Sequence, residues 1–474
     1  MSAARDAVAA REATAAGATW SGRDAAFDRR ARRLPVDPGP AGWNRLLPER
    51  RPRPPLDGAV EADWLVVGAG FAGLAAARRL HELAPGTRTV LLEASAVADG
   101  PAGRNSGFMI DLPHDLGSAD YRGTGAVDDR MQTRMNRAAI DFAETMARRY
   151  RMPPEAAVRS GKVNAAASEA GERLNRDYAA HLAALGEPHE TLDARAMTEL
   201  TGTRFYRGGL RTPGTLMLQP AFYARALADG LAGEGAVQLH ERSPVLRLTR
   251  ERGRWRAETP GGTASAPKAV LAVNGHAESF GLFPGRLLHV FTYASMTEAL
   301  APEAVRRLGG ERSWGLTPAD PMGTTVRRVS GAGGERIVVR NRFTCDPDMT
   351  VPDGRLERVA RDHDRAFRAR FPVLGDVPMA YRWGGRLCLS RNGVPAFGEV
   401  EDGLYAACCQ NGLGAARGTF AGMMAAELAC GTGHPMLAEM RAFAAPARLP
   451  PRSLAALGAN AAMRWREWRA GVEL

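Results

Sequence analysis

The chain is poor in lysine and cysteine and has no long apolar run, and each shortage narrows what it can be. Lys162 and Lys268 are the only lysines among 474 residues, so the net charge of +11 comes almost entirely from arginine. The arginines are spread along an Ala- and Gly-rich chain, which is typical of a coding bias and not of a concentrated nucleic-acid site. We therefore expect no nucleic-acid partner. A basic binding protein with an inactive nucleotide fold is the alternative.

Cysteine usage argues against disulfides and metals. The five cysteines are Cys345, Cys388, Cys408, Cys409 and Cys430. An odd number without a C-x-x-C pair predicts neither a disulfide framework nor a zinc site, and the histidines form no H-E-x-x-H motif. We expect no metal, and we expect a reducing compartment, the cytoplasm.

Apolar runs are short. No stretch of about 18 uncharged apolar residues occurs, so no membrane span is predicted. Residues 1–33 mix Ala with charged residues and lack the apolar core of a secretory signal. What is left is an ordinary globular protein, long enough for two or three domains.

The most specific pattern lies between Asp63 and Glu93. A short apolar strand leads into a G-x-G-x-x-G turn over residues 68–73, a helical pattern follows, and a second apolar strand ends at Glu93. The first glycine permits the turn, the second lets backbone approach a pyrophosphate, and the third lets the helix pack on the strand. The helix N-terminus offers N–H groups to the phosphates, and Glu93 would accept hydrogen bonds from ribose hydroxyls. This stretch predicts a dinucleotide site.

A second glycine-rich turn, Gly412 to Gly418, also follows a strand and opens a helix. No strand with an acidic end comes after it, so we interpret it as an approach to the same cofactor from the other end. The chain then lacks the second fingerprint that a two-site, NADPH-dependent flavin monooxygenase would need. We expect electrons to come from the substrate itself.

Five blocks together resemble the FAD-dependent oxidoreductases of the D-amino acid oxidase, glycine oxidase and sarcosine oxidase superfamily. The likeness is strongest to the bacterial γ-glutamylputrescine oxidase-like branch. In chain order the blocks are Asp63–Glu93, Ala102–Phe108, Leu271–Gly275, Trp383–Gly385 with Asn392–Gly398, and Asn411–Gly414. The second block looks like the loop that follows the ribose-binding acid in that branch. The resemblance extends over about Gly42 to Gly431.

The resemblance implies an α/β fold with a discontinuous, Rossmann-type FAD-binding domain. It also implies a second, α+β substrate domain built on a mainly antiparallel sheet. We expect the FAD-binding domain in residues 61–115, 205–285 and 385–435, and the substrate domain in residues 116–204 and 286–384. Residues 1–60 would form an extended lead-in and residues 436–474 a helical tail. The amphipathic part of the tail, Leu454 to Trp468, is expected to dock on its own protein; contact with a membrane or a partner is the alternative.

The resemblance further implies non-covalent FAD and oxidation of a C–N bond in a small-molecule amine or amino acid. The substrate would give a hydride to flavin N5, the imine would hydrolyse, and O₂ or an electron carrier would reoxidise the flavin. A biosynthetic tailoring oxidase acting on a larger substrate is the alternative. The oxygen-activating lysine of the sarcosine oxidase branch has no match, since Lys268 is expected at the surface. Cys388, Cys408 and Cys409 are expected to pack and not to bind flavin. The oligomeric state stays open.

The residues expected to contact the cofactor lie in these blocks and at one further strand. They are Gly68, Gly70, Phe71, Ala72, Gly73, Glu93, Arg104, Asn105, Ser106, Gly107, Val245, Asn274, Gly275, Asn411, Gly412, Leu413 and Gly414. Arg104, Asn105 and Ser106 are expected to form hydrogen bonds to flavin N5, to O4 or to a phosphate; a polar loop without that role is the alternative.

Four residues are candidates for chemistry. His114 and His289 would contact substrate or accept a proton, Arg340 would hold a substrate carboxylate, and Arg391 would place positive charge near flavin O2. Each has a structural alternative: His114 could form a loop pair with Asp111, and a lone histidine in a sheet, such as His289, is more often structural. Arg340 is preferred to Arg327, Arg328 and Arg342, its neighbours in strand patterns, for the carboxylate role.

Overall fold

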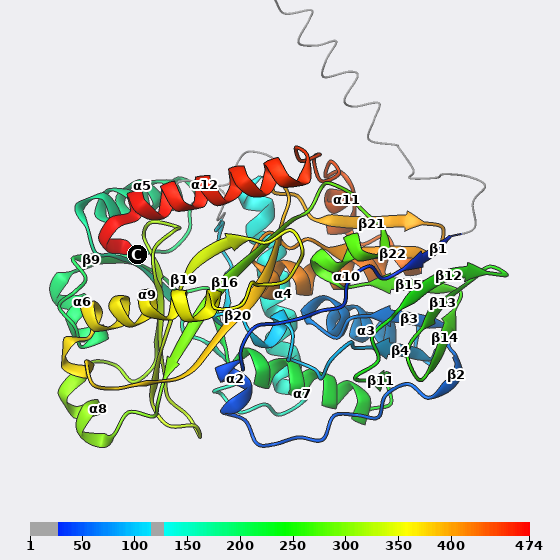
Figure 1. Ribbon diagram of the computed structural model, residues 1–474, viewed down its shortest axis with the longest axis horizontal. Helices are drawn as coiled ribbons and strands as arrows, with labels where there is room; N and C mark the ends of the chain where they lie inside the picture. The colour runs from blue at the N-terminus through cyan, green and yellow to red at the C-terminus, as the bar shows by residue number, and fades with distance from the viewer. Residues whose placement is uncertain (1–26, 115–127) are drawn as a thin grey trace, which may run out of the picture.

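The computed structural model describes residues 27–114 and 128–474. Figure 1 shows two parts: an α/β part on the right of the view and a part built on long antiparallel strands on the left. The expected α/β fold with a second, mainly antiparallel domain is confirmed. None of the described helices is long and apolar enough to cross a membrane.

A six-stranded sheet forms the centre of the α/β part. From edge to edge its strands are β11 (Gln238–His240), β4 (Thr89–Leu92), β3 (Trp64–Val67), β15 (Lys268–Leu271), β22 (Leu404–Cys408) and β21 (Ala396–Glu401). The first five are parallel, and β21 runs antiparallel to β22. The strands come from three separate stretches of the chain, so this domain is discontinuous.

Strand β3 shows why the sheet is covered on both faces. All four of its residues are buried. Trp64 and Val66 belong to one hydrophobic core, and Leu65 and Val67 belong to another. Because successive side chains of a strand point to opposite faces, an uninterrupted apolar strand needs packing on both sides. On the first side lie the helices α3 (Phe71–Leu83), α4 (Asp129–Arg149), α7 (Pro220–Gly233) and α10 (Gly414–Cys430).

A five-stranded sheet covers the other face. Its strands, in order, are β1 (Asp28–Arg30), β12 (Arg247–Glu251), β13 (Arg254–Glu258), β14 (Gly262–Ala266) and β2 (Gly58–Glu61). Trp255 of β13 is fully buried in the core that also holds Leu65 and Val67. The fold thus places the turn after β3 at the edge of two well-packed cores.

The second part is an eight-stranded sheet. In order its strands are β20 (Met379–Leu389), β16 (Leu288–Thr297), β19 (Arg336–Cys345), β18 (Thr325–Val329), β17 (Trp314–Pro318), β7 (Lys162–Ala166), β9 (Gly208–Thr212) and β8 (Glu190–Asp193). Only the β17–β7 pairing is parallel among the strand pairs described for it. Around it lie α5 (Glu169–Leu185), α6 (Ala194–Thr201), α8 (Pro302–Leu308), α9 (Arg355–Arg370) and α12 (Arg452–Ala470). The remaining elements include β5 (Phe108–Met109), β6 (Ala157–Arg159) and β10 (Leu216–Leu218), which form a small sheet, and α2 (Gly42–Arg45) and α11 (Pro435–Arg441).

Two of the expected domain boundaries need correction. Strand β9 begins inside the segment 205–285 that we expected in the FAD-binding domain, and β20 runs past residue 385, yet both belong to the eight-stranded sheet. Short strands before a helix look alike in either domain, so the sequence pattern does not say which sheet they join. The lead-in is extended as expected over much of residues 27–60, but it also contains β1, α2 and β2. Its first 26 residues lie outside the described part.

Gly422→Ala tests the packing of α10 on α3. A Cβ on Gly422 would overlap the backbone carbonyl of Ala72, and backbone cannot yield as a flexible side chain can. We expect the free energy of unfolding to fall by about 1–3 kcal/mol, the usual cost of overpacking.

The matched control is Gly458→Ala in α12, where an added Cβ would meet nothing within 4 Å. Replacing this helical glycine should raise stability by up to about 1 kcal/mol. Urea unfolding of both variants gives the comparison, and equal effects would contradict the close helix contact.

Candidate cofactor and substrate site

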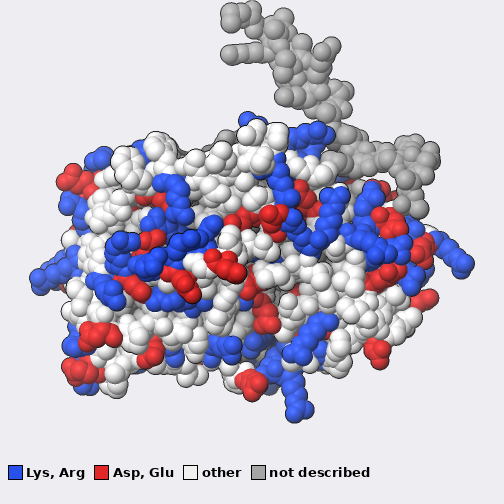
Figure 2. All heavy atoms as spheres, in the orientation of Figure 1, with Lys and Arg blue, Asp and Glu red and all other residues white. Residues whose placement is uncertain are grey.

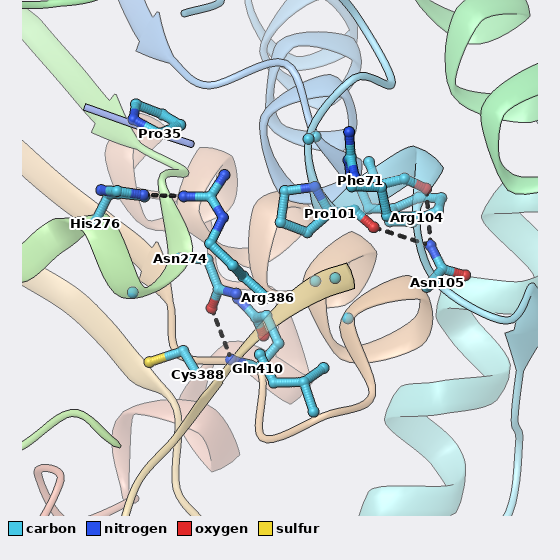
Figure 3. A pocket seen from close by; sticks show the side chains of 18 of the residues that line it. Pro35, Phe71, Pro101, Arg104, Asn105, Asn274, His276, Arg386, Cys388 and Gln410 are labelled. Atoms are coloured by element: carbon cyan, nitrogen blue, oxygen red, sulfur yellow. Dashed lines mark hydrogen bonds between the residues drawn. The ribbon is translucent and has the colours of Figure 1, made fainter. Parts of the chain in front are cut away.

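One elongated cavity runs between the two parts. It begins at the β3–α3 turn and Glu93, passes the loops that hold Asn105, Asn274 and Gln410, and ends against strands β16, β17 and β19. Figure 3 shows side chains from both parts of the molecule around it. One cavity therefore joins a dinucleotide cradle to the face of the antiparallel sheet.

The β3–α3 turn has the geometry that the fingerprint predicts. Gly68 has a φ of +100°, a conformation that side chains rarely adopt, and a Cβ on Gly73 would overlap the carbonyl of Gly68. Gly70 caps α3 without any side-chain hydrogen bond, so the first N–H groups of the helix have no capping side chain. A Cβ on Gly70 would meet only Ala102, at 3.9 Å, so the space beside it belongs to the cavity. Phe71 and Ala72 line the cavity; Gly73 supports the turn from behind.

Glu93 lies on the cavity wall with each carboxylate oxygen held by a backbone donor. Ala69 N donates to Oε2 at 2.8 Å and Ser95 N donates to Oε1 at 3.0 Å. Burial raises the pKa of Glu93 above its usual value. The two bonds fix the carboxylate, and each oxygen keeps acceptor capacity for the ribose hydroxyls that the sequence pattern predicts.

The side chains of Arg104 and Asn105, which we expected to bind the flavin, form hydrogen bonds with backbone groups of the protein. The Arg104 guanidinium donates to the carbonyls of Pro38, Gly39 and Gly384, at 3.0–3.1 Å. Asn105 donates to the carbonyl of Ala102 at 2.8 Å and accepts from the N–H of Gly107. These bonds hold the lead-in and shape the loop, as Figure 3 shows for Asn105.

The same loop still reaches the cavity. Arg104, Asn105 and Ser106 all line it. Gly107 does not line it, because its Cβ position is filled by Arg327 and the carbonyl of Leu218. Two of the polar side chains that we expected at the flavin, those of Arg104 and Asn105, therefore have structural partners of their own.

The two remaining cofactor blocks meet at the far side of the cradle. Asn274 Oδ1 accepts from the N–H of Gln410 at 3.3 Å, and Val245, Asn274, Gly275, Gly412, Leu413 and Gly414 all line the cavity. Helix α10 begins here without a side-chain cap, so a second helix N-terminus faces the same space as α3. Asn411 is different: it is buried, accepts from Ser390 N at 2.8 Å, donates to the carbonyl of Gly393 at 3.0 Å, and does not line the cavity.

Three of the four candidates for chemistry line the cavity, and the fourth does not. His114 and Arg340 line the sheet end of the cavity. Burial, with the charges of Lys162 and Arg340, lowers the pKa of His114 well below its usual value, so its imidazole is neutral. His289 also lines the cavity, but its Nε2 lies 2.6 Å from Glu278 Oε2. Arg391 is exposed and does not line the cavity, so the structure does not bring it together with the other three.

Arg386 is a partly buried cation at the cavity that sequence reasoning missed. It lies five residues before Arg391, lines the cavity, and forms two 2.8 Å hydrogen bonds with Asp37 of the lead-in. Its guanidinium also contacts His276 (Figure 3), and burial together with this charge lowers the pKa of His276 to about 3. Ala31, Arg33, Leu34 and Pro35 line the cavity beside it. An acidic residue within a proline-rich lead-in was the signal for this strap, which we define as residues 31–39.

A lysine lies directly behind the cavity wall. Lys162 is 3% exposed; its Nζ donates to Thr317 Oγ1 at 3.2 Å and contacts Asn164 Oδ1. Thr317 lines the cavity and donates to the same Asn164 oxygen at 2.7 Å. Burial lowers the pKa of Lys162 to about 7, against a smaller opposing effect of Asp111. Lys268, by contrast, is half-buried and donates to the carbonyl of Ala429.

The cysteines are free among the described residues. Cys388 lines the cavity, whereas Cys408 and Cys409 are buried in the core around Trp255. Burial raises the pKa of Cys408 to about 12, so this thiol is unreactive. No group of three His, Cys, Asp or Glu residues able to hold a metal occurs in the described ranges. Non-covalent FAD stays a prediction.

Gly70→Val tests the cradle. Because the nearest protein atom to a Cβ here is 3.9 Å away, the apoprotein should fold as before, while the side chain occupies the space expected for the pyrophosphate. We expect the purified variant to lose its flavin absorbance and to resist reconstitution with FAD.

The control for that variant is Gly433→Val, at an exposed glycine where an added Cβ meets nothing within 4 Å. It should purify with its flavin. A yellow Gly70→Val protein would mean that the cofactor lies elsewhere.

Lys162→Met tests the buried lysine through pH. The pKa of Lys162 is lower in the folded protein, about 7, than in the unfolded chain, so the unfolded chain binds the extra proton between about pH 7 and 10. Raising the pH through this range therefore stabilises the wild type, by at most about 1.4 kcal/mol per pH unit.

We expect Lys162→Met to be more stable than the wild type at pH 6 and to lose that advantage by pH 9. Thermal unfolding at both pH values measures this, with Lys268→Met as the control for losing one lysine. An advantage that is the same at both pH values would show that Lys162 is not a buried titrating group.

The comparisons with known proteins agree with this geometry. Curated relatives include the probable oxidoreductase OrdL of Rhizobium meliloti (strain 1021), 27% identical over 84% of this chain and 90% of that protein. The gamma-glutamylputrescine oxidoreductase of Escherichia coli (strain K12) is 24% identical over 79% of this chain and 84% of that protein.

Solved structures share the fold. Glycine oxidase from Geobacillus kaustophilus superposes with a TM-score of 0.66 at 19% identity, covering 82% of this chain and all of the other. The family model described as "DAO: FAD dependent oxidoreductase" matches residues 63–428, which span the cradle, the antiparallel sheet and α10 up to Leu428. The chain therefore belongs to the DAO family of FAD-dependent oxidoreductases, and FAD is its cofactor.

Proposed function

We propose that this flavoenzyme oxidises a C–N bond in an amino acid, or in another amine that carries a carboxylate. The observation that carries the proposal is the charge of the cavity beyond the cradle. Arg340 lines it, and Arg33 and Arg386 line it as well, the latter two in ion pairs with Asp348 and Asp37. Glu93, at the cradle end, is the one carboxylate among the described lining residues. A cavity wall of this sign favours a substrate with a negative group.

Arg340 is the residue best placed to receive that group. It lies on β19, opposite Ala294 of β16 and Thr325 of β18, and all three residues line the cavity. Its guanidinium lies over the ring of Phe343, 4.7 Å from the ring centroid, which fixes the side chain. A planar guanidinium held in this way suits two-point binding of a carboxylate. Arg386 also lines the cavity, in an ion pair with Asp37.

The residues around the cavity would orient the substrate and exclude water. FAD supplies the hydride acceptor when it is bound. The neutral imidazole of His114 would accept a hydrogen bond from the substrate amine without repelling it, and Thr317 would offer its hydroxyl from the same wall. His289, already bound to Glu278, is the weaker candidate for taking up a proton.

The names of the relatives point to the same class of substrate. The E. coli relative is a gamma-glutamylputrescine oxidoreductase, and structural neighbours include glycine oxidases and L-amino acid deaminases. We propose O₂ or an electron carrier as acceptor and the cytoplasm as location; these parts of the proposal rest on the family resemblance and on cysteine usage.

The experiment is an anaerobic titration of the purified protein with a panel of amines and amino acids, in which the flavin absorbance is measured after each addition. Bleaching by amino acids and not by the corresponding decarboxylated amines is the expected result. Bleaching by the simple amines alone would contradict the carboxylate. A flavin band that no member of the panel bleaches would favour the tailoring oxidase with a larger substrate.

Arg340→Gln should raise KM for the amino acid about 10–100-fold, since a hydrogen bond to a charged group contributes about 1.5–3 kcal/mol. The corresponding methyl ester, which has no carboxylate, should react with the variant much as it does with wild type. The matched control is Arg342→Gln, two residues along β19, where Arg342 binds Asp362 and Glu467 and does not line the cavity. Equal KM effects from both substitutions would overturn the assignment.

A further inference from the structure

Helix α12 turns one polar face to the protein and one apolar face to solvent. The inward contacts come from residues spaced three and four apart. Asn460 forms a pair of hydrogen bonds with the backbone of Cys345, at 2.8 and 2.9 Å, and Glu467 accepts from Phe343 N at 3.0 Å and from Arg342 at 2.9 Å. Met463 and Ala470 pack between them in a small apolar cluster. The expected docking of the tail on its own protein is therefore present, through this face alone.

Large apolar side chains stay exposed on another face of the same segment. Leu454, Leu457, Trp465 and Trp468 of α12, with Val472 just beyond its end, are between 53% and 78% exposed. At 100° per residue the four positions within α12 fall on one side of the helix, away from Asn460 and Glu467. Val472 lies beyond the helix end at Gly471. The five side chains are half of the ten large apolar side chains exposed in the described part of the chain. We call them the α12 stripe.

Charge around the stripe is of one sign. Arg464, which is half exposed and pairs with Glu467 at 2.7 Å, lies on one side of it. Arg466 and Arg469 lie on the other side, by the same helical geometry. Arg469 lies over the ring of Trp465, 4.9 Å from the centroid. The two acidic residues of this segment, Glu467 and Glu473, are 1% and 3% exposed and point inward. The charged residues on the outward surface of α12 are therefore all arginines.

We infer that α12 is an interfacial helix that holds the enzyme on an anionic lipid surface. Tryptophan and leucine would enter the boundary between headgroups and acyl chains, and the flanking arginines would reach the lipid phosphates. In Figure 2 the upper edge of the molecule, where α12 runs in Figure 1, is largely white with blue atoms beside it. The chain's net charge of +11 acts in the same direction.

A second copy of the chain fits this surface less well. Two α12 helices packed stripe to stripe would bring arginines on both margins close together, and α12 exposes no acidic side chain to pair with them. Like charges facing each other across an interface oppose association. A lipid surface supplies the missing negative charge along the whole helix.

The test is flotation of the purified holoenzyme with vesicles of phosphatidylcholine alone and of phosphatidylcholine with phosphatidylglycerol. Wild type should float with the anionic vesicles, should float much less with the neutral ones, and should dissociate partly in high salt. A Trp465→Ser/Trp468→Ser variant should lose at least about tenfold in vesicle affinity, the loss expected when two large interfacial side chains are removed. Its flavin content and unfolding temperature should stay at wild-type values, because both side chains are exposed.

The matched control is Val158→Ser/Val373→Ser, which removes two exposed apolar side chains far from α12 in sequence and should float as wild type does. Three results would overturn the proposal. The first is no flotation of wild type with anionic vesicles, and the second is equal flotation with both kinds. The third is a wild-type dimer in solution that the tryptophan variant converts to a monomer. None of these results depends on the enzyme's substrate. A result that contradicts the membrane helix therefore leaves the proposed reaction untouched, and the reverse is also true.

Discussion

Backbone contact between two helices and one turn is the constraint on which the site depends. Gly73 lets α3 rest on the carbonyl of Gly68, and Gly422 lets α10 rest on the carbonyl of Ala72. With any side chain at these glycines the three segments would have to separate. Because they do not, the N-termini of α3 and α10 reach the same cavity, although more than 300 residues of chain lie between them. The positive ends of both helix dipoles therefore face one cavity.

The antiparallel sheet is attached to the α/β part beside this helix contact. Strands β16 and β20 pair along most of their length, and β20 passes the Arg104 loop, where Trp383 Nε1 donates to the carbonyl of Arg104 at 2.9 Å. The same strand carries Arg386 and Cys388 to the cavity. Thus the sheet that presents Arg340 is tied by hydrogen bonds to the loop that borders the cradle. In the proposed reaction, the position of the substrate relative to the cofactor would thus be set by strands.

The sequence predicted the geometry of the cradle well, because the β3–α3 turn and Glu93 lie within about thirty residues of each other and follow local rules.

The sequence predicted a residue's role poorly wherever the partner of its side chain is remote in the chain. Arg386 was missed and Arg391 was chosen, since only contact with Asp37, 349 residues away, distinguishes the two. Arg104 lines the cavity and Asn411 does not, and both side chains are held by backbone groups from other segments. Lys162 gave no signal, because its burial depends on β17 pairing with β7. The amphipathic pattern of the tail could be predicted. Which face of the helix stays exposed could not, because it depends on the hydrogen bonds between Asn460 and the remote Cys345.

The strap over residues 31–39 implies an order of assembly. Asp37 leaves the ribosome 349 residues before Arg386, its partner, and Pro38 must wait nearly as long for the N–H of Gly384. Until β20 is complete, the strap lacks these two partners, and only its bonds to earlier parts of the chain, such as those from Arg104, can hold it. The wall of the cavity that the strap supplies is therefore finished late in synthesis, by residues from opposite ends of the chain.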